Sequence, residues 1–175
     1  MTTGIFASSH EIQVGVRRVR AEDWQLVRCV RLAALADAPS AFERTLEEEL
    51  AMPDGHWEQS AANYARGDSS SGFLAMIGEV PCGFVVGVLS EPQQAELFAL
   101  WVAGNVRRRN IGRSLVQAVS EWATQRGAVQ LSLRVVAANS GAVGLYRAQG
   151  FAVEAGASGS CGSRRAPALR MHKRL

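Results

Sequence analysis

The sequence predicts a single mixed α/β domain built around one sheet, and three observations lead to this class. The chain has 175 residues, 47% of them hydrophobic, which is enough for one domain with a substantial core. Two β-rich runs joined by turn residues 78–81 predict a hairpin. Further on, an apolar run over 96–102 leads through a basic loop into a helical pattern over 111–125 and a second strand-like run, 130–136. Two strands connected in this way should be parallel, with a right-handed crossover.

The elements expected before the hairpin are a strand, a capped helix and a broken helical segment. Apolar residues alternate over 12–19, which is the period of a half-buried strand. Asp23 is placed to cap the helix that follows, and Pro39 lies just beyond the end of that helix. Residues 42–64 predict either one interrupted helix or two short helices, because Pro53-Asp54-Gly55 interrupts the pattern.

The hairpin strands and the C-terminal elements follow the same periodicities. The hairpin strands are predicted over residues 73–77 and 83–89. A helix and two final strands are predicted over residues 142–149, 151–155 and 168–172. The Gly/Ser-rich stretch 156–163 is predicted to be a flexible loop. Residues 1–11 show neither periodicity nor a signal-peptide pattern, so we expect a flexible tail followed by one domain over 12–175.

Composition and charge argue against several classes of function. No apolar run is long enough to span a membrane. The net charge is +3, but the basic residues lack the interleaved aromatic side chains of a nucleic-acid surface. Cys29, Cys82 and Cys161 lack metal-ligand spacing, as do the three histidines, so no metal site is expected; the odd number of cysteines favours reduced thiols in a cytoplasm. Cys29 and Cys82 have apolar neighbours and are predicted to fill the core.

The most informative stretch runs from Leu100 to Arg113, where an apolar strand enters a basic loop that opens onto a helix. This order points backbone N–H groups and the positive end of a helix dipole into the loop, and four arginines add attraction for phosphate. The loop has neither the G-x-G-x-x-G of dinucleotide folds nor the G-K-[ST] of P-loops. By itself, the stretch is either a pyrophosphate site or a solvated basic surface.

A second segment lies downstream, and the two together resemble a known family. Asn139 is placed to cap a helix and Gly150 to end it, with Tyr146 two turns from Asn139 on the same face. The two segments resemble the GNAT superfamily of acyl-CoA-dependent N-acyltransferases. The family motif Q/R-x-x-G-x-G/A is matched over 107–112 except at the first glycine, where Asn110 stands. The signature N-x-x-A-x-x-x-Y-x-x-x-G-F is reproduced in full by Asn139, Ala142, Tyr146, Gly150 and Phe151. The resemblance extends from Val14 to Lys173, the N-terminal third matching only in pattern.

The resemblance implies a strongly bent mixed sheet flanked by helices, in which two central parallel strands splay apart. In the family the pantetheine arm of acetyl-CoA, the co-substrate, fills that gap. The cofactor-binding residues implied here are Leu100, Trp101, Val102, Arg107, Arg108, Arg109, Asn110, Ile111, Gly112, Arg113 and Asn139. Asparagine is the non-glycine residue that best tolerates a left-handed backbone, so Asn110 is a mild departure from the family pattern.

The resemblance also implies two catalytic residues. Tyr146 matches the position that commonly protonates the leaving CoA thiolate; a surface aromatic is the alternative reading of that residue. Glu96 matches a base that some relatives, such as histone acetyltransferases, carry early on the strand before the loop; an exposed strand-end carboxylate is its alternative, and a water relay could replace it. Ribosomal-protein N-terminal acetyltransferases use a glutamate on the next strand, where this chain has Arg134.

The function implied is transfer of an acetyl group from acetyl-CoA to a primary amine by direct attack in a ternary complex. A non-catalytic acyl-CoA-binding or sensing domain is the alternative. The acceptor, a small-molecule or peptide amine, is left open, and so is the oligomeric state, including a homodimer. Acidic residues between Glu43 and Glu58 are either a rim that attracts a cationic amine or a solvated helix face.

Overall fold

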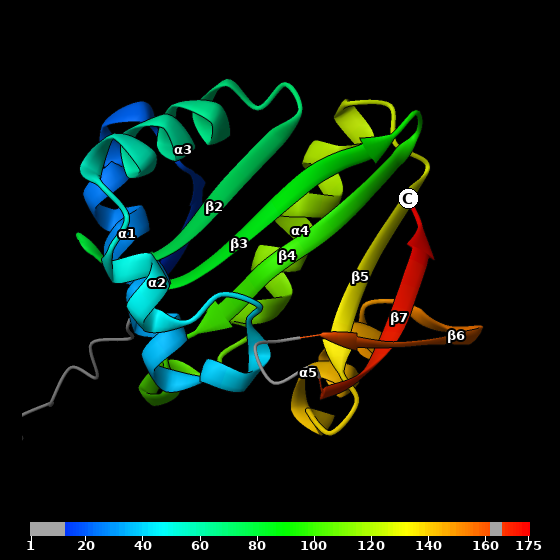
Figure 1. Ribbon diagram of the computed structural model, residues 1–175. Helices are drawn as coiled ribbons and strands as arrows, with labels where there is room; N and C mark the ends of the chain where they lie inside the picture. The colour runs from blue at the N-terminus through cyan, green and yellow to red at the C-terminus, as the bar shows by residue number, and fades with distance from the viewer. Residues whose placement is uncertain (1–12, 162–165) are drawn as a thin grey trace, which may run out of the picture.

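A computed structural model gives the structure of residues 13–161 and 166–175. Within these residues one sheet has seven strands in the order β1-β2-β3-β4-β5-β7-β6 (Figure 1). The strands are β1 (Val14–Arg18), β2 (Ser70–Ile77), β3 (Val80–Glu91), β4 (Gln94–Val102), β5 (Gln130–Val136), β6 (Ala152–Cys161) and β7 (Ala166–Arg174). Neighbouring strands are antiparallel except for the central pair β4–β5, which is parallel. The predicted mixed α/β class, with its parallel βαβ unit, is confirmed.

Helices cover both faces of the sheet (Figure 1). They are α1 (Trp24–Asp37), α2 (Leu46–Leu50), α3 (Asp54–Arg66), α4 (Ile111–Gln125) and α5 (Ser140–Ala148). α4 packs on β2, β3 and β4, and its fully buried Trp122 belongs to the larger apolar core, together with Val85 of β3. The next residue of β3, Val86, points to the other face and belongs to the core beneath α1 and α3.

The N-terminal helices begin close to where the sequence predicts, with two differences. Asp23 stands at the N-cap of α1, but its carboxylate accepts hydrogen bonds from the backbone N–H of Arg20 (2.7 Å) and from the Arg17 guanidinium (2.9 Å), not from the first turn of α1. The helical segment is broken over residues 51–53 and not over 53–55, because Asp54 and Gly55 already belong to the first turn of α3. A proline directly before a helix fits there since the first turn needs no donor from it.

The parallel strands β4 and β5 pair only over their first halves. The pairing runs from Gln94 opposite Gln130 to Leu97 opposite Leu133, and no pair follows. At Ala99 the backbone of β4 takes a positive φ of 55°, and its register with β3 shifts there. Such a bulge bends a strand. The second half of β4 therefore stays with β3 and leaves β5 (Figure 1), which confirms the predicted splay.

Two local predictions are wrong. The backbone of residues 156–161 belongs to β6 and pairs with β7 across an irregularity after Val153, so it is not a loop. Pairing with a neighbouring strand has overridden the Gly/Ser-rich composition. Cys29 is exposed, because it lies on the solvent side of α1, away from the buried Val27 and Val30, whereas Cys82 is buried as predicted.

Parts of the remaining predictions fall outside the structure. The predicted tail, residues 1–11, and the end of the predicted loop, residues 162–163, lie outside the described residues. Across the two described ranges, no helix has the length and apolar character needed to cross a membrane.

Candidate active site

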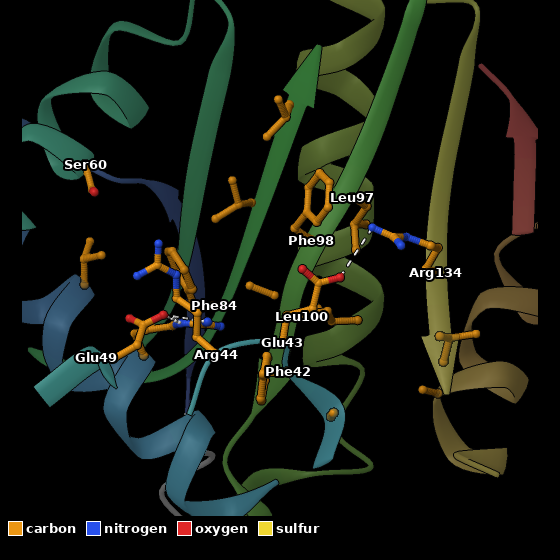
Figure 2. Close-up of a pocket in the computed structure, with 18 of the residues that line it drawn as sticks. Phe42, Glu43, Arg44, Glu49, Ser60, Phe84, Leu97, Phe98, Leu100 and Arg134 are labelled. Atoms are coloured by element: carbon orange, nitrogen blue, oxygen red, sulfur yellow. Dashed lines mark hydrogen bonds and ion pairs between the residues drawn. The ribbon is translucent and has the colours of Figure 1, made fainter. Parts of the chain in front are cut away.

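A cavity of about 430 Å³ opens beside the separated ends of β4 and β5, on the face of the sheet that carries α1 and α3. Volumes of this size are typical of small-molecule sites. The main apolar side chains of its lining are Phe42, Trp57, Phe84, Val86, Val88 and Phe98. Its acidic and arginine side chains are Arg31, Glu43, Arg44, Glu49 and Arg134. Figure 2 shows these residues converging from the helices on one side and from β4 and β5 on the other.

The loop between β4 and α4 displays a run of unpaired backbone donors. The N–H groups of residues 108–113 donate no hydrogen bond to any group in the described part of the chain. Asn110 has a φ of 62° and Arg108 a φ of 65°, so both residues are left-handed. Left-handed residues within a turn can gather successive N–H groups into a concave anion site, and the start of α4 at Ile111 adds its dipole. The loop therefore has the backbone geometry of a phosphate site, with Asn110 in the conformation expected of it.

Arg107, one of the four arginines of this loop, is already engaged by the protein. Its Nε donates to the carbonyl of Val102 (2.9 Å), and its Nη2 donates to the carboxylate of Asp37. The indole N–H of Trp101 donates to the same carboxylate (2.9 Å). These two donors, Trp101 above all, lower the pKa of Asp37. The Arg107 side chain thus ties the loop to the end of α1 and occupies the Val102 carbonyl.

The other three arginines, Arg108, Arg109 and Arg113, are exposed, and none forms an ion pair within the described residues. Gly112 packs closely against α5, because a Cβ at this position would lie 3.0 Å from a methyl carbon of Leu145, which would have to shift to make room. The loop therefore combines a fixed backbone with three guanidinium groups that face solvent.

Asn139, the N-cap of α5, and Tyr146 of α5 both line the cavity, so they face the same side, as their spacing predicts. The Asn139 side-chain oxygen accepts from the backbone N–H of Ala142 (3.1 Å), so the predicted N-cap is formed. Tyr146 is buried, and its ring packs edge-on against Phe151 with 5.6 Å between the centroids. The Tyr146 hydroxyl makes no hydrogen bond to a described residue, and burial raises the pKa of the phenol well above its usual value. Tyr146 is thus an unpaired, protonated phenol at the cavity.

Glu96 lies beside the cavity and is not part of its lining. Its carboxylate is 3.8 Å from Nε of Arg134, which does line the cavity. A second carboxylate, that of Glu43 in the connection between α1 and α2, lies 3.5 Å from Nη2 of the same arginine (Figure 2). Two carboxylates therefore share one guanidinium where β4 and β5 separate. Sequence reasoning had placed Glu43 only in a general acidic cluster.

A buried ion pair forms the opposite wall of the cavity. Glu49 of α2 accepts from Nε and Nη2 of Arg31 on α1, at 3.2 and 2.8 Å. The two side chains are only 7% and 16% exposed, and the Arg31 guanidinium lies 4.8 Å from the ring centroid of Phe42. The burial of Tyr64, which also lines this end, raises the pKa of its phenol. Sequence reasoning missed this pair; the available signal was an acidic residue three positions after Leu46, on the side of α2 that turns inward.

The acidic residues between 43 and 58 divide between the two roles considered for them. Glu43 and Glu49 line the cavity, whereas Glu47, Glu48, Asp54 and Glu58 are exposed and do not. Most of the cluster is therefore a solvated surface, and the cavity rim is not acidic throughout. No group of three or more metal-ligating side chains occurs among the residues that the structure describes.

Comparison with known proteins gives one family. A model described as the acetyltransferase (GNAT) family matches residues 32–151. No curated protein sequence matches the chain.

Solved structures share the fold. An acetyltransferase of the GNAT family from Streptococcus pneumoniae has a TM-score of 0.79 at 19% identity, covering 93% of this chain and 99% of that chain. A ribosomal-protein-alanine N-acetyltransferase from Brucella melitensis has a TM-score of 0.75 at 22% identity, with coverages of 92% and 99%. PaiA N-acetyltransferase from Thermoplasma acidophilum, solved in complex with coenzyme A, has a TM-score of 0.68 at 18% identity, with coverages of 93% and 99%.

Proposed function

Because the chain belongs to the acetyltransferase (GNAT) family, we propose that it transfers the acetyl group of acetyl-CoA to a primary amine by direct attack in a ternary complex. One observation carries the proposal. β4 loses its pairing with β5 after Leu97, and β4 then leads into a loop whose N–H groups over 108–113 are unpaired. An extended amide-bearing arm ending in a pyrophosphate fits this sequence of features, with the arm along β4 and the phosphates over the loop.

The backbone of Leu100, Trp101 and Val102 is the part of β4 proposed to bind the pantetheine arm. The Val102 carbonyl already accepts from Arg107, so the arm uses the remaining groups of this segment that face β5. Phosphate binding falls to the N–H groups of the loop and to the guanidinium groups of Arg108, Arg109 and Arg113. Arg107 instead holds the loop in place by its ion pair with Asp37 at the end of α1.

The reaction proposed is a nucleophilic acyl substitution. The ammonium form of the acceptor first loses a proton, since an alkylammonium has a pKa near 10.4 and only the free amine has a lone pair. The nitrogen then bonds to the thioester carbonyl carbon, the oxyanion is held by backbone N–H near Val102, and the C–S bond breaks. Tyr146 protonates the departing thiolate and regains its proton from the amine nitrogen or from water. The balance is an amide, CoA thiol and one proton released to solvent.

The raised pKa of the Tyr146 phenol bears on its role. A phenol that stays protonated always presents its O–H to the sulfur, and the dry site that raises its pKa also disfavours a bare thiolate. Both effects favour a proton shared between oxygen and sulfur as the C–S bond breaks. Removal of the ammonium proton is assigned to the carboxylates beside Arg134 or to a water relay; Glu43 reaches the cavity directly, whereas Glu96 lies behind Arg134.

The test is a binding titration followed by a transfer assay. Isothermal titration with acetyl-CoA and with CoA should show binding that weakens about ten- to a hundredfold in the Arg108→Ala/Arg109→Ala double variant, because two charge-assisted contacts to phosphate are lost. Arg126→Ala, at the other end of α4, is the matched control and should bind as wild type does. Unchanged affinity in a folded double variant would remove the proposed phosphate site.

A screen of acceptor amines, read as release of CoA thiol, then separates the enzyme from a domain that only binds or senses acyl-CoA. Small-molecule amines and peptide N-termini both belong in that screen. A protein that binds acetyl-CoA and releases no thiol with any amine would be the sensor.

Three further statements remain predictions from the sequence: that residues 12–175 form one domain, that the protein is a homodimer, and that it is located in the cytoplasm.

A further inference from the structure

The charges around the cavity are unevenly distributed between its two ends. At the splayed end, Arg134 is paired with both Glu43 and Glu96, so the uncompensated charge there is a carboxylate. At the helix end, Glu49 is paired with Arg31 by two hydrogen bonds, and Arg44 forms no ion pair with a described residue. The uncompensated charge at the helix end is therefore a guanidinium. Figure 2 shows Glu43 and Arg134 on one side of the cavity and Glu49 and Arg44 on the other.

The helix end also retains unused hydrogen-bonding groups. Glu49 accepts both Arg31 bonds on Oε1, and neither Oε2 of Glu49 nor Nη1 of Arg31 has a partner among the described residues. Within the same residues, the unpaired side-chain atoms that are fully enclosed are Arg28 Nε and Trp57 Nε1. The two free atoms of the Arg31–Glu49 pair are therefore accessible, at the cavity that both residues line. A buried ion pair contributes little net stability, so its place in a cavity wall is better explained by what it holds.

The surface between the two ends is apolar. Phe84 and Val86 of β3 form part of it, and Phe42 and Phe98 lie beside them. This surface offers no partner for a charge in the middle of a ligand, because a polar group buried there would lose its hydration without replacement.

Resting on the proposed acetyl transfer, we propose that the acceptor carries an anionic group at the end away from its amine, with an apolar segment between them. The ammonium lies against Glu43 at the splayed end, within reach of the acetyl group. The anionic group lies against Arg44, with Nη1 of Arg31 as a second donor. A polyamine would place its second cation against Arg44, where like charges repel.

One acidic side chain outside the cavity competes for Arg44. Glu48 is near enough for Arg44 to contribute to the lowering of the Glu48 pKa, but the capping box with Thr45 is the larger cause. The carboxylate of Glu48 accepts from the Thr45 backbone N–H (2.7 Å) and does not line the cavity. Nη1 of Arg44 also donates to the sulfur of Met52 (3.9 Å), but a thioether is a weak acceptor, so the guanidinium remains available to a ligand.

The experiment compares acceptors that differ only in the charge of their far end. 4-Aminobutanoate, 6-aminohexanoate and 8-aminooctanoate are each assayed beside the alkylamine and the diamine of the same carbon number, with CoA-thiol release as the readout. At the best chain length, kcat/KM should be about tenfold or more higher for the amino carboxylate than for the alkylamine, and lowest for the diamine. The difference should lie mainly in KM, because the far end does not take part in the chemistry.

Variants of Arg44 assign the preference to a residue. Arg44→Gln should bring kcat/KM for the amino carboxylate down to about the value of the alkylamine measured with the same variant, and Arg44→Glu should make the diamine the better acceptor. Arg66→Gln, an exposed arginine of α3 outside the lining, should behave as wild type does. Titration with acetyl-CoA checks that each variant is folded and still binds the cofactor.

Equal kcat/KM for the three acceptors of a set, or a preference that Arg44→Glu leaves unchanged, would overturn the inference while leaving the transferase in place. Transfer to the diamines or to a peptide N-terminus alone would do the same. Failure to transfer to any of the nine compounds also overturns it, since the acceptor class would then not be used. The proposed function fails separately, by loss of acetyl-CoA binding or by no thiol release in the wider amine screen.

Discussion

The loop proposed to bind the cofactor and the cavity wall proposed to bind the acceptor, here called the acceptor wall, are built in opposite ways. The loop over 108–113 is contiguous in sequence, and its binding groups are backbone N–H groups held by two left-handed residues and a helix start. The acceptor wall is assembled from α1, α2, the connection between them and β5, and its charged groups are the side chains of two ion pairs together with Arg44, which forms no ion pair with a described residue. Backbone N–H groups are present whatever the residue type, whereas each side chain can be replaced by a single substitution. Substitutions in the acceptor wall can therefore change the acceptor without changing how the cofactor is bound.

The largest expected effect is at Tyr146, which belongs to α5 and lines the cavity. Tyr146→Phe should lower kcat about 10²–10⁴-fold, the usual contribution of a positioned acid, with much smaller changes in acceptor KM and acetyl-CoA affinity. The variant removes one hydroxyl that has no protein partner and keeps the ring against Phe151. Steady-state kinetics with any acceptor that the screen identifies is the measurement. Turnover equal to wild type would show that the thiolate leaves without this acid.

Removing the buried ion pair of the acceptor wall should lower the free energy of unfolding and leave acetyl-CoA binding by the loop unchanged. Glu49→Leu leaves the Arg31 charge unpaired in a mostly buried position and should lower the free energy of unfolding by about 2 kcal/mol, a value reduced for access of water from the cavity. The Arg31→Met/Glu49→Leu double variant should recover most of that loss, because no buried charge remains.

Thermal unfolding measures both variants, with a decrease in Tm of about 4–8 °C expected for the single one. Glu47→Gln on the exposed side of α2 is the control. All of these variants should bind acetyl-CoA with wild-type affinity. A double variant less stable than the single one would mean that the pair is a net stabilising contact and not a ligand-binding device.

Alkaline pH should lower the stability of the folded protein through the Tyr146 phenol. The Tyr146 phenol has a raised pKa in the folded protein, so the folded state keeps its proton when the unfolded state has lost one, above about pH 10. Stability is then fully present below the unfolded pKa and falls as pH rises, by up to about 1.4 kcal/mol per pH unit. The pKa of Tyr64 is also raised, and this residue is still present in Tyr146→Phe. The difference in pH dependence between the wild type and Tyr146→Phe therefore reports on Tyr146 alone. Denaturant unfolding between pH 8 and 11 measures the free energy of unfolding of both proteins. If the two free energies change with pH in parallel, the burial of the Tyr146 phenol is contradicted.

The contiguity of each region decided how much of it could be predicted from the sequence. The helix over 111–125, the strand over 130–136, the Asn139 cap and the left-handed Asn110 depend on neighbours within a few residues, and the structure has them as expected. The splay and the family followed from two motifs of fixed spacing, and the family match agrees. Predictions of this kind succeed because their causes are local.

The acceptor wall could not be predicted because its contacts join distant segments. Arg31 and Glu49 are eighteen residues apart, and Arg134 and Glu43 are ninety-one residues apart. The ion pair between Arg107 and Asp37 is a similar case. Arg107 stands in a motif typical of phosphate binding, and the motif does not indicate that its partner is a residue seventy positions away. Composition also misled at 156–161, where pairing with β7 made a strand of a Gly/Ser-rich stretch.

The smallest expected effect tests the loop itself, at the position where the family motif has glycine. Asn110 has a φ of 62°, and an alanine there would carry the penalty for a left-handed backbone, about 1 kcal/mol, without the tolerance of asparagine. Glycine removes that penalty but makes the unfolded chain more flexible, so the two effects nearly cancel. We therefore expect Asn110→Ala to lower Tm by about 2–4 °C and Asn110→Gly to stay close to wild type. Acetyl-CoA affinity, by titration, should fall a few-fold in Asn110→Ala and change less than about threefold in Asn110→Gly, because the backbone N–H groups keep their direction. A tenfold gain in Asn110→Gly would instead mean that the asparagine side chain obstructs the phosphates, and the loop would then be less complete than its backbone suggests.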